Sequence, residues 1–404
     1  MVLGLSKRIQ GSYIFYRGLA SGLAILFSLF YSKGLGVENR SIVTVIFVTA
    51  LIFLTVCTSG FSLAFRSHFQ PGVSPTQFSA FFWLSIFSAG FVSLAALLSL
   101  SLYSHLKSEI PQVLLTLALA YTFWVTLADL SHQALLAFKK FKVAAVIDLL
   151  GVFIQIVTYV SLNLTHKISL ASSLFSSIIV SYVVSTLLSL VFIMQRQSLD
   201  FNLSIRSIWN LIRQSKPFQV VGISHGLADR IDRFLLAWFM PLSFLGSYSV
   251  GTSLLMYTRF IPEAIERLIV GKQFVFSIEV ARKSLVKWII TLLLVLGAAV
   301  SAALVSKLFV SILLGELWSI PTSVILMFAV QEILRGYYYF VIAHFVANTQ
   351  TKLVQNLSGA LVPLSFFNGF IGLKLFGGFG VPFGIAVSYG LLIVLAAVKS
   401  AQNE

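Results

Sequence analysis

The stretch from residue 220 to 240 reads VVGISHGLADRIDRFLLAWFM, and the interpretation of the whole chain depends on it. Inside a segment otherwise apolar enough to lie in lipid stand four charged residues: Asp229, Arg230, Asp232 and Arg233. A charge at the centre of a bilayer costs about 2.5 to 3.5 kcal/mol on insertion scales. Four such charges are hard to tolerate against lipid, so we expect this face to line a watery cavity or to contact charged partners.

The composition of the chain is that of an integral membrane protein. Of its 404 residues, 58% are hydrophobic and only 10% are charged, whereas soluble domains carry roughly 25% charged residues. A net charge of +15 would indicate nucleic acid binding in a soluble protein. In a membrane protein, basic loop residues set the topology and contact anionic lipid headgroups. We therefore expect membrane lipids, and no nucleic acid, as partners.

Windows of about 20 mostly apolar residues predict about twelve transmembrane helices. We place them at residues 9–31, 42–64, 78–103, 111–136, 143–164, 169–194, 216–238, 242–261, 285–310, 319–346, 353–373 and 379–398. Proline or glycine stands near several of the ends, as at Pro111, Pro241 and Gly377. Most basic residues fall on the side of the N-terminus, which places both termini in the cytoplasm.

Two predicted inner loops are longer than the others. Residues 195–215 are interpreted as the link between two lobes, residues 1–200 and 201–404. Residues 262–284 suit either a helix on the inner membrane surface or a plain connector with topogenic charges. The expected fold class is therefore an all-α polytopic membrane protein with two pseudo-symmetric six-helix lobes.

The charges of the seventh predicted helix share one face. His225, Asp229 and Asp232 follow the i, i+4, i+7 spacing, and Arg233 lies four residues after Asp229. A satisfied ion pair between Asp229 and Arg233 would explain part of the pattern by helix packing alone. Asp232 fits that explanation poorly, because it has no basic residue at i±4 and lies three residues from Asp229. A proton-exchanging carboxylate is the alternative interpretation of Asp232.

Other predicted helices carry charges too. Glu332 and Arg335 lie three residues apart in the tenth helix, beside the run Tyr337 to Tyr339. Arg17 lies about 12 Å into the first helix at 1.5 Å per residue. It shares a stripe with Tyr13, Ser21 and Ser28.

Two further acids lie in the predicted membrane helices. Asp129 and Asp148 lie near inner helix ends, a turn or two from Lys139, Lys140 and Lys142. Snorkelling of these carboxylates to the interface explains them without a functional role.

The sequence lacks the motifs of catalysis and cofactor binding. It has no His/Cys cluster, no Gly-rich phosphate loop and no Ser/His/Asp set, and Cys57 is its single cysteine. The outer loops are also too short to build an extramembrane catalytic face. We therefore expect no metal, no cofactor and no enzymatic activity.

Two stretches carry a family resemblance. LGVENRS at residues 35–41 follows the first helix, and residues 226–255 read GLADRIDRFLLAWFMPLSFLGSYSVGTSLL. With twelve helices and both ends inside, they resemble the polysaccharide-exporter branch of the multidrug/oligosaccharidyl-lipid/polysaccharide (MOP) superfamily. These proteins are flippases for O-antigen and exopolysaccharide repeat units.

The match to the family motifs is partial. The first loop of the family reads closer to Leu-Gly-Pro-Glu-Gly-Arg-Gly, with which Leu35, Gly36, Glu38 and Arg40 agree while Val37, Asn39 and Ser41 depart. In the second stretch, the family has an aspartate, an apolar run and a Leu-Gly-x-Tyr-Ser element. The matching residues are Asp232, Leu245, Gly246, Tyr248 and Ser249.

The resemblance implies a two-lobed transporter that alternates between inward and outward openings. Its cargo would be an oligosaccharide linked to undecaprenyl diphosphate, moved across the bacterial inner membrane for O-antigen or exopolysaccharide biosynthesis. A polymerase of the same glycan pathway is a candidate partner, and a proton or sodium ion is the candidate coupling ion.

Roles for individual residues follow from that cargo. The guanidinium fork matches phosphate oxygens, so the candidate cavity cations are Arg17, Arg230, Arg233 and Arg335. The candidates for coupling or ion pairing are His225, Asp229, Asp232 and Glu332. Candidates for stacking on sugars are Tyr13, Tyr16 and Tyr339, although packing is the commoner use of a buried tyrosine.

Other functions are weighed against this one. A cation-coupled multidrug exporter of the same superfamily would share the fold, but should carry carboxylates in the cavity of the first lobe. A sugar facilitator of the other large twelve-helix family has an Asp-Arg/Gly-Arg loop signature, which residues 66–77 lack. A polymerase or ligase of glycan biosynthesis would need a long outer loop.

Overall fold

The computed structural model describes residues 7–68, 75–107, 109–165, 168–195, 204–255, 304, 307–318, 320–347 and 350–402. The chain forms two compact units, Met1–Leu227 and Ala228–Glu404. The predicted lobe boundary after residue 200 stays a prediction.

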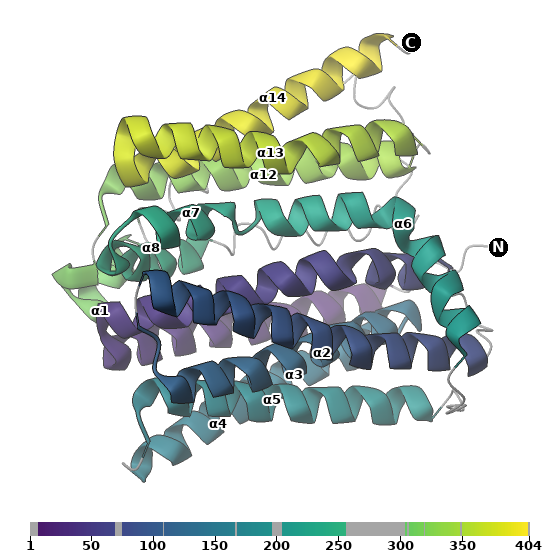
Figure 1. The fold of residues 1–404 in the computed structure, drawn as a ribbon, viewed down its shortest axis with the longest axis horizontal. Coiled ribbons are helices and arrows are strands. Elements are labelled where there is room, and N and C mark those ends of the chain that lie inside the picture. The colour runs from purple at the N-terminus through teal and green to yellow at the C-terminus, as the bar shows by residue number, and fades with distance from the viewer. Residues whose placement is uncertain are drawn as a thin grey trace. The chain divides into compact units, whose positions relative to one another are not determined.

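The first unit consists of long helices that lie side by side (Figure 1). In chain order they are α1 (Lys7–His68), α2 (Pro75–Leu106), α3 (Gln112–Ala137), α4 (Phe141–Leu164), α5 (Leu170–Met194) and α6 (Ile205–Ala228). The last residue of α6 already belongs to the second unit.

The second unit combines short helices with three long ones. They are α7 (Ile231–Phe239), α8 (Leu242–Leu255), η2 (Glu316–Trp318), α12 (Thr322–Ala347), α13 (Thr351–Phe376), η3 (Gly377–Phe379) and α14 (Gly380–Gln402). All regular elements in the described ranges are helical, which confirms the all-α prediction. The ends of α3, α4 and α5 agree with the predicted ends within two residues.

The first two predicted helices are the two segments of α1, which meet at a single non-helical residue. Gly36 has φ 75° and ψ 166°, outside the helical region. A positive φ strains side chains with a Cβ, which glycine lacks. The chain therefore needs only one residue, rather than the predicted ten-residue loop, to join the two segments.

The predicted seventh helix, residues 216–238, is wrong as a continuous helix. Helix α6 begins at Ile205, and it ends at Ala228, before a turn at Asp229 and Arg230. Helix α7 then begins at Ile231. The i, i+4, i+7 face expected for His225, Asp229 and Asp232 is therefore interrupted in its middle.

The predicted linker, residues 195–215, contains the first half of α6. Leu211 is 3% exposed and lies in a core cluster with Phe61, Phe78 and Leu130 of the first unit. Ile208 and Ile212 pack against the same cluster. Apolar residues spaced three and four apart explain this helix, and we misread them as a loop. The predicted surface helix at residues 262–284 lies outside the described residues.

Helix surfaces in both units suit lipid rather than water. Among the described residues, six helical stretches are long and apolar enough to cross a membrane. Two of them, Phe15–Phe61 and Lys352–Lys399, have 47 and 48 residues, enough for two crossings each. Large apolar side chains lie on the outside, such as Leu98 at 72% exposed and Phe367 at 62%. The protein is a multi-pass membrane protein.

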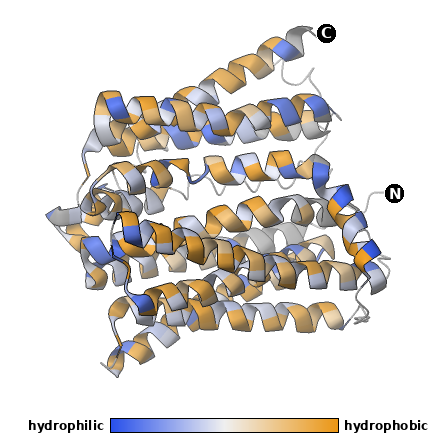
Figure 2. Ribbon diagram, viewed as in Figure 1, coloured by the Kyte–Doolittle hydropathy of each residue, from blue (hydrophilic) through white to orange (hydrophobic). Residues whose placement is uncertain are grey.

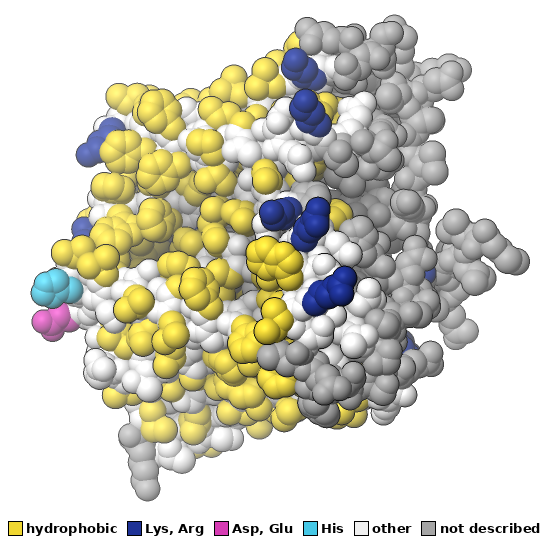
Figure 3. Space-filling view, turned by 45° about the vertical axis from the view of Figure 1, so that its right-hand side comes forward, with side chains coloured by type: hydrophobic (Ala, Val, Ile, Leu, Met, Phe, Trp, Pro, Cys, Tyr) yellow, Lys and Arg dark blue, Asp and Glu magenta, His cyan; other side chains and the backbone are white. Residues whose placement is uncertain are grey.

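The distribution of side chains agrees with a bilayer. Hydrophobic residues dominate the middle of the long helices, and hydrophilic ones gather towards helix ends (Figure 2). On the face drawn in Figure 3, hydrophobic side chains cover a broad area, and Lys and Arg side chains lie near its edges.

Small residues let the helices approach closely. A Cβ at Gly384 of α14 would collide with the backbone of Asn368 in α13, so these two helices touch at the backbone. In the first unit, Ser181 of α5 donates a hydrogen bond to the Gly151 carbonyl of α4 at 2.7 Å. Helix pairs in membranes commonly pack through small and hydroxyl residues in this way.

Candidate functional site

The turn between α6 and α7 determines where the four charges of the opening stretch point. Arg230 has φ −128° and ψ −5°, and it stands at the N-terminal cap of α7. Asp232 lies in the first turn of α7, where the helix dipole favours a carboxylate. Because the helix is broken here, Asp229 and Asp232 contact different partners.

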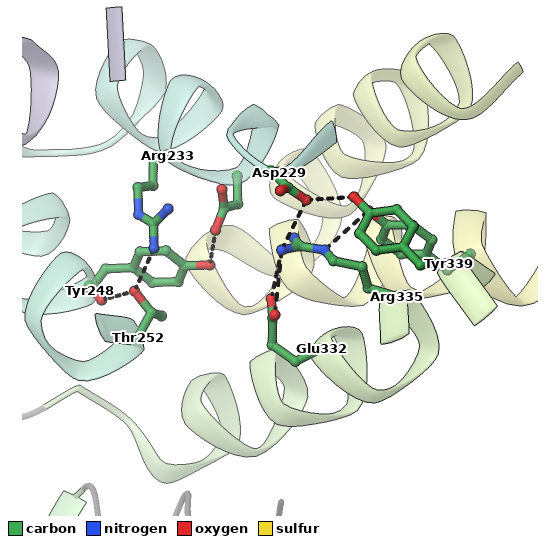
Figure 4. A network of polar contacts seen from close by, with 9 residues as sticks. Asp229, Arg233, Tyr248, Thr252, Glu332, Arg335 and Tyr339 are labelled. Atoms are coloured by element: carbon green, nitrogen blue, oxygen red, sulfur yellow. Dashed lines mark hydrogen bonds and ion pairs between the residues drawn. The ribbon is translucent and has the colours of Figure 1, made fainter. Parts of the chain in front are cut away.

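Asp229 belongs to a polar network centred on Arg335 of α12 (Figure 4). The Arg335 Nη1 lies 3.2 Å from Asp229 Oδ1 and 3.3 Å from Glu332 Oε1. Tyr339 donates to Asp229 Oδ1 at 2.8 Å. The Arg335 Nε donates to the Tyr389 hydroxyl of α14 at 3.1 Å. One guanidinium thus connects the α6–α7 turn with α12 and α14.

The burial of this network favours a structural ion cluster in the state seen here. The side chains of Arg335 and Glu332 are 1% and 0% exposed, while that of Asp229 is 26% exposed. Removing one member of a buried ion cluster leaves an uncompensated charge and typically costs about 3 to 5 kcal/mol. Arg335 therefore contacts two carboxylates in this structure, and its predicted role as a cation that binds the substrate stays a prediction.

Asp232 and Arg233 contact α8. Tyr248 donates to Asp232 Oδ2 at 2.9 Å. The other oxygen, Oδ1, has no hydrogen-bond partner among the described residues, although Asp232 is 0% exposed. Arg233 Nη2 donates to Thr252 Oγ1 at 3.4 Å, and Thr252 donates to the Tyr248 carbonyl at 2.7 Å. A buried carboxylate with an unsatisfied oxygen is costly, so a proton or a cation bound at this oxygen would stabilise it.

Among six ionisable residues of the α6–α7 turn, α7 and α12, acidic and basic side chains are equal in number. Asp229, Asp232 and Glu332 supply three carboxylates, and three guanidiniums come from Arg230, Arg233 and Arg335. When all six are ionised, the group is neutral. Protonation of one carboxylate would therefore give this group of six charged residues a net positive charge.

The other predicted site residues lie in the first unit. Arg17 and Tyr16 are half-buried in α1, and His225 is half-buried near the end of α6. The side chain of Tyr13 lies outside the described residues. The structure thus brings Asp229, Glu332, Arg335 and Tyr339 together.

Three polar residues of the network were missed from the sequence: Tyr248, Thr252 and Tyr389. Tyr248 was quoted only as part of a family motif, and its hydroxyl contact with Asp232 gives that motif a physical meaning. Tyr389 lies 54 residues from Arg335 in the chain. No local spacing could have identified that pair.

A second polar cluster joins α3 and α4 in the first unit. His132 Nδ1 lies 3.2 Å from Asp148 Oδ1, with side chains 16% and 34% exposed. Gln133 donates to Asp129 Oδ1 at 3.4 Å. Asp148 thus contacts a histidine on the neighbouring helix, a contact that the snorkelling interpretation did not include.

Metal binding has no support in the described part of the chain, where no group of three or more His, Cys, Asp or Glu residues could hold an ion.

Solved structures with the same fold are transporters. An outward-facing multidrug resistance transporter of the MATE family, from the MOP superfamily, has a TM-score of 0.69 at 15% identity, with 99% of this chain and 96% of that chain covered. The lipid II flippase MurJ, in an inward closed conformation, has a TM-score of 0.68 at 13% identity, with coverages of 98% and 88%. A MOP superfamily transporter from Pyrococcus furiosus has a TM-score of 0.58 at 14% identity, with coverages of 98% and 97%.

Sequence comparison identifies the family. No curated protein matches the chain. The family described as polysaccharide biosynthesis protein matches residues 35–323, which is more than half of the 404 residues. The chain therefore belongs to the polysaccharide biosynthesis protein family, and it has the fold of the MOP-superfamily transporters.

Proposed function

We propose that the protein flips a polyprenyl-diphosphate-linked oligosaccharide across the bacterial inner membrane, by alternating access, for O-antigen or exopolysaccharide biosynthesis. The observation that carries this proposal is the family match over residues 35–323 in a chain with a transporter fold. The family name supplies the glycan pathway, and the fold supplies movement across the membrane. The similarity to a lipid II flippase supports a lipid-linked cargo.

The chemistry of the cargo fits the cationic residues of the membrane helices. A diphosphate is at least doubly anionic, and arginine binds phosphate oxygens through two parallel hydrogen bonds. Arg17 is half-buried within the apolar stretch Phe15–Phe61. An arginine at that depth is expensive against lipid. We assign Arg17 to the cargo's diphosphate, with Arg230 and Arg233 as further candidates.

The network of the second unit is the candidate coupling device. Asp232 is fully buried and has one oxygen without a hydrogen-bond partner among the described residues. A proton or a sodium ion would satisfy that oxygen. Neutralising Asp232 would weaken the hydrogen bond that it accepts from Tyr248, and so weaken the interaction between α7 and α8. Asp229, at 26% side-chain exposure, is the more accessible carboxylate of the network.

We place both termini in the cytoplasm, because basic residues gather in the loops on the side of the N-terminus. A polymerase of the same glycan pathway is the candidate protein partner, since it would use the translocated repeat unit.

Complementation of a bacterium that lacks its own flippase tests the proposal. The wild-type chain is expected to restore surface polysaccharide, and Arg17→Ala is expected to leave lipid-linked repeat units on the inner face. Lys33→Ala is the matched control, because Lys33 is an exposed cation on the same helix. Full activity of Arg17→Ala would remove the role assigned to Arg17.

A multidrug exporter is the second candidate function, favoured by the carboxylates of the first unit. Asp129 and Asp148 are half-buried in α3 and α4, where they could attract a cationic drug. Ion-driven efflux of a cationic dye from cells that express the chain would support this function. Restored polysaccharide without dye efflux would exclude it.

A further inference from the structure

Arg40 is a buried arginine that has no carboxylate partner among the described residues. It lies four residues after the break of α1 at Gly36, and it is 5% exposed. Its Nη1 donates to the Tyr31 hydroxyl at 2.7 Å, and its Nη2 lies 3.5 Å from Ser28 Oγ. The guanidinium also lies over the Tyr31 ring, 5.0 Å from its centroid. Its Nε has no hydrogen-bond partner among the described residues.

These contacts give the Arg40 guanidinium hydrogen-bond acceptors, but none of them carries a formal negative charge that would compensate the positive one. Hydroxyl oxygens and a ring face carry partial charges only, whereas a buried guanidinium is usually paired with an anion. Burial also strengthens the attraction that such a cation exerts on an arriving anion. Arg40 therefore differs from a surface arginine, whose charge is screened by water.

The first unit offers no carboxylate that could take this place in the described structure. Its helices α3 and α4 carry Asp129 and Asp148, which contact Gln133 and His132. Glu38 lies two residues from Arg40, but its side chain is exposed. Glu109 is exposed in the segment between α2 and α3.

Arg40 also continues a polar stripe on the first segment of α1. Arg17, Ser21, Ser28 and Tyr31 share one helix face by their spacing. From Arg17 to Tyr31 the stripe is about 21 Å long at 1.5 Å per residue. Arg40 contacts Ser28 and Tyr31 at its far end. One arginine thus stands near each end of a stripe that crosses most of the bilayer.

We propose that Arg40 forms a phosphate-binding site, with Ser28 and Tyr31 as positioning residues, at the end of the first unit opposite the N-terminus of α1. Tyr31 holds the guanidinium in the arrangement seen here. An arriving phosphate group accepts hydrogen bonds from Nε and Nη2, the two donors on one edge of the guanidinium, and replaces the Ser28 hydroxyl, which lies 3.5 Å from Nη2. Its source is either the diphosphate of a lipid-linked cargo or a phospholipid headgroup.

Titration of the purified full chain with inorganic pyrophosphate tests the site. The protein is held in a phospholipid-free detergent at constant ionic strength, and binding is followed by tryptophan fluorescence. Charge-assisted hydrogen bonds are strong enough that Arg40→Gln should weaken binding at least about tenfold. Equal affinity of wild type and Arg40→Gln would overturn the proposal.

Further variants show whether binding depends on the buried Arg40, on the surface charge of the protein, or on the folding of the variant. Lys33→Gln removes an exposed cation near the same break of α1 at Gly36, and should change the affinity less than about twofold. If Lys33→Gln lost as much affinity for pyrophosphate as Arg40→Gln, the anion would be attracted by surface charge alone, and the proposed site would be wrong. Arg40→Lys keeps the charge and should retain part of the binding. Thermal unfolding without pyrophosphate must show that Arg40→Gln is folded.

Glycerol phosphate distinguishes the two sources of phosphate. If pyrophosphate binds clearly more tightly than this headgroup mimic, the site is matched to a diphosphate carrier. If both bind equally, the site takes a phospholipid headgroup.

The cargo assignment rests on the proposed function, but the binding test needs no glycan. Absent pyrophosphate binding would remove the Arg40 site even if complementation succeeds. If pyrophosphate binds but complementation fails, the phosphate site stands, and only the assignment of a lipid-linked cargo is wrong.

Discussion

Arg335 and Arg40 are buried to a similar extent but have opposite surroundings. Arg335 of the second unit is 1% exposed and contacts the carboxylates of Asp229 and Glu332. Arg40 of the first unit is 5% exposed and contacts two hydroxyl groups and a tyrosine ring. Burial alone therefore does not identify a structural arginine, because the counter-charge decides the role. Arg335 contacts carboxylates of the α6–α7 turn and of α12, which favours a structural role, whereas the surroundings of Arg40 are the basis for the anion site that we propose.

The largest expected effect comes from removing the arginine that has counter-charges. Arg335→Met leaves Asp229 and Glu332 as like charges with reduced compensation, and should lower the free energy of unfolding by about 3 to 5 kcal/mol. Denaturant unfolding of the purified protein in detergent measures it. Arg335→Lys, which keeps the charge, should recover part of the loss. A loss below about 1 kcal/mol for Arg335→Met would contradict the structural role.

The next effect concerns the carboxylate that has one hydroxyl partner. Tyr248→Phe removes the hydrogen bond to Asp232, and should destabilise the protein by about 1.5 to 3 kcal/mol, because the acceptor is charged and buried. The same substitution in an Asp232→Asn background should cost less. Equal losses in both backgrounds would mean that Asp232 is neutral in the resting protein.

A smaller stability change is expected for the arginine that lacks a counter-charge. Arg40→Gln removes hydrogen bonds to two neutral hydroxyl groups, but it also removes a buried charge that has no carboxylate partner among the described residues. The two effects oppose each other, so the net loss should stay within about 0.5 to 1.5 kcal/mol, measured in the same unfolding experiment. This comparison with Arg335→Met sharpens the distinction between the two arginines. If Arg40→Gln proves as destabilising as Arg335→Met, Arg40 is a structural residue.

The smallest effect belongs to the pair that is neither fully buried nor fully exposed. His132→Ala removes the contact with Asp148, whose side chain is 34% exposed. Partly solvated ion pairs contribute about 0 to 1 kcal/mol. Unfolding experiments on this variant should show a loss within that range, and a larger loss would place the pair with the buried network.

Much of the fold could be predicted because apolar windows are long and their ends carry proline or glycine. Helices α3 to α5 and α12 to α14 lie close to their predicted positions. The break between α6 and α7 could not be read from periodicity, since the apolar residues continue on both sides of Asp229. The first half of α6 was missed because only part of its surface is apolar.

The candidate site was predicted in part. The charges themselves marked Asp229, Asp232, Glu332 and Arg335, but their pairing depends on helices that are distant in the chain. The contact between Asp229 and Tyr339 spans 110 residues, so it follows from the fold alone. Arg40 was interpreted as part of a loop motif, and its burial could not be predicted because Gly36 alone joins the two segments of α1 and places Arg40 in the second one.

The most direct test of the central claim is the sidedness of lipid-linked repeat units in a flippase-null bacterium that expresses this chain. Inner-membrane vesicles of known orientation can be probed with a membrane-impermeant enzyme that cleaves the glycan. We predict that the wild-type chain moves the repeat units to the outer face, and that Arg17→Ala leaves them on the inner face. Repeat units that stay inside with the wild-type chain, in strains covering the common O-antigen and exopolysaccharide types, would contradict the account.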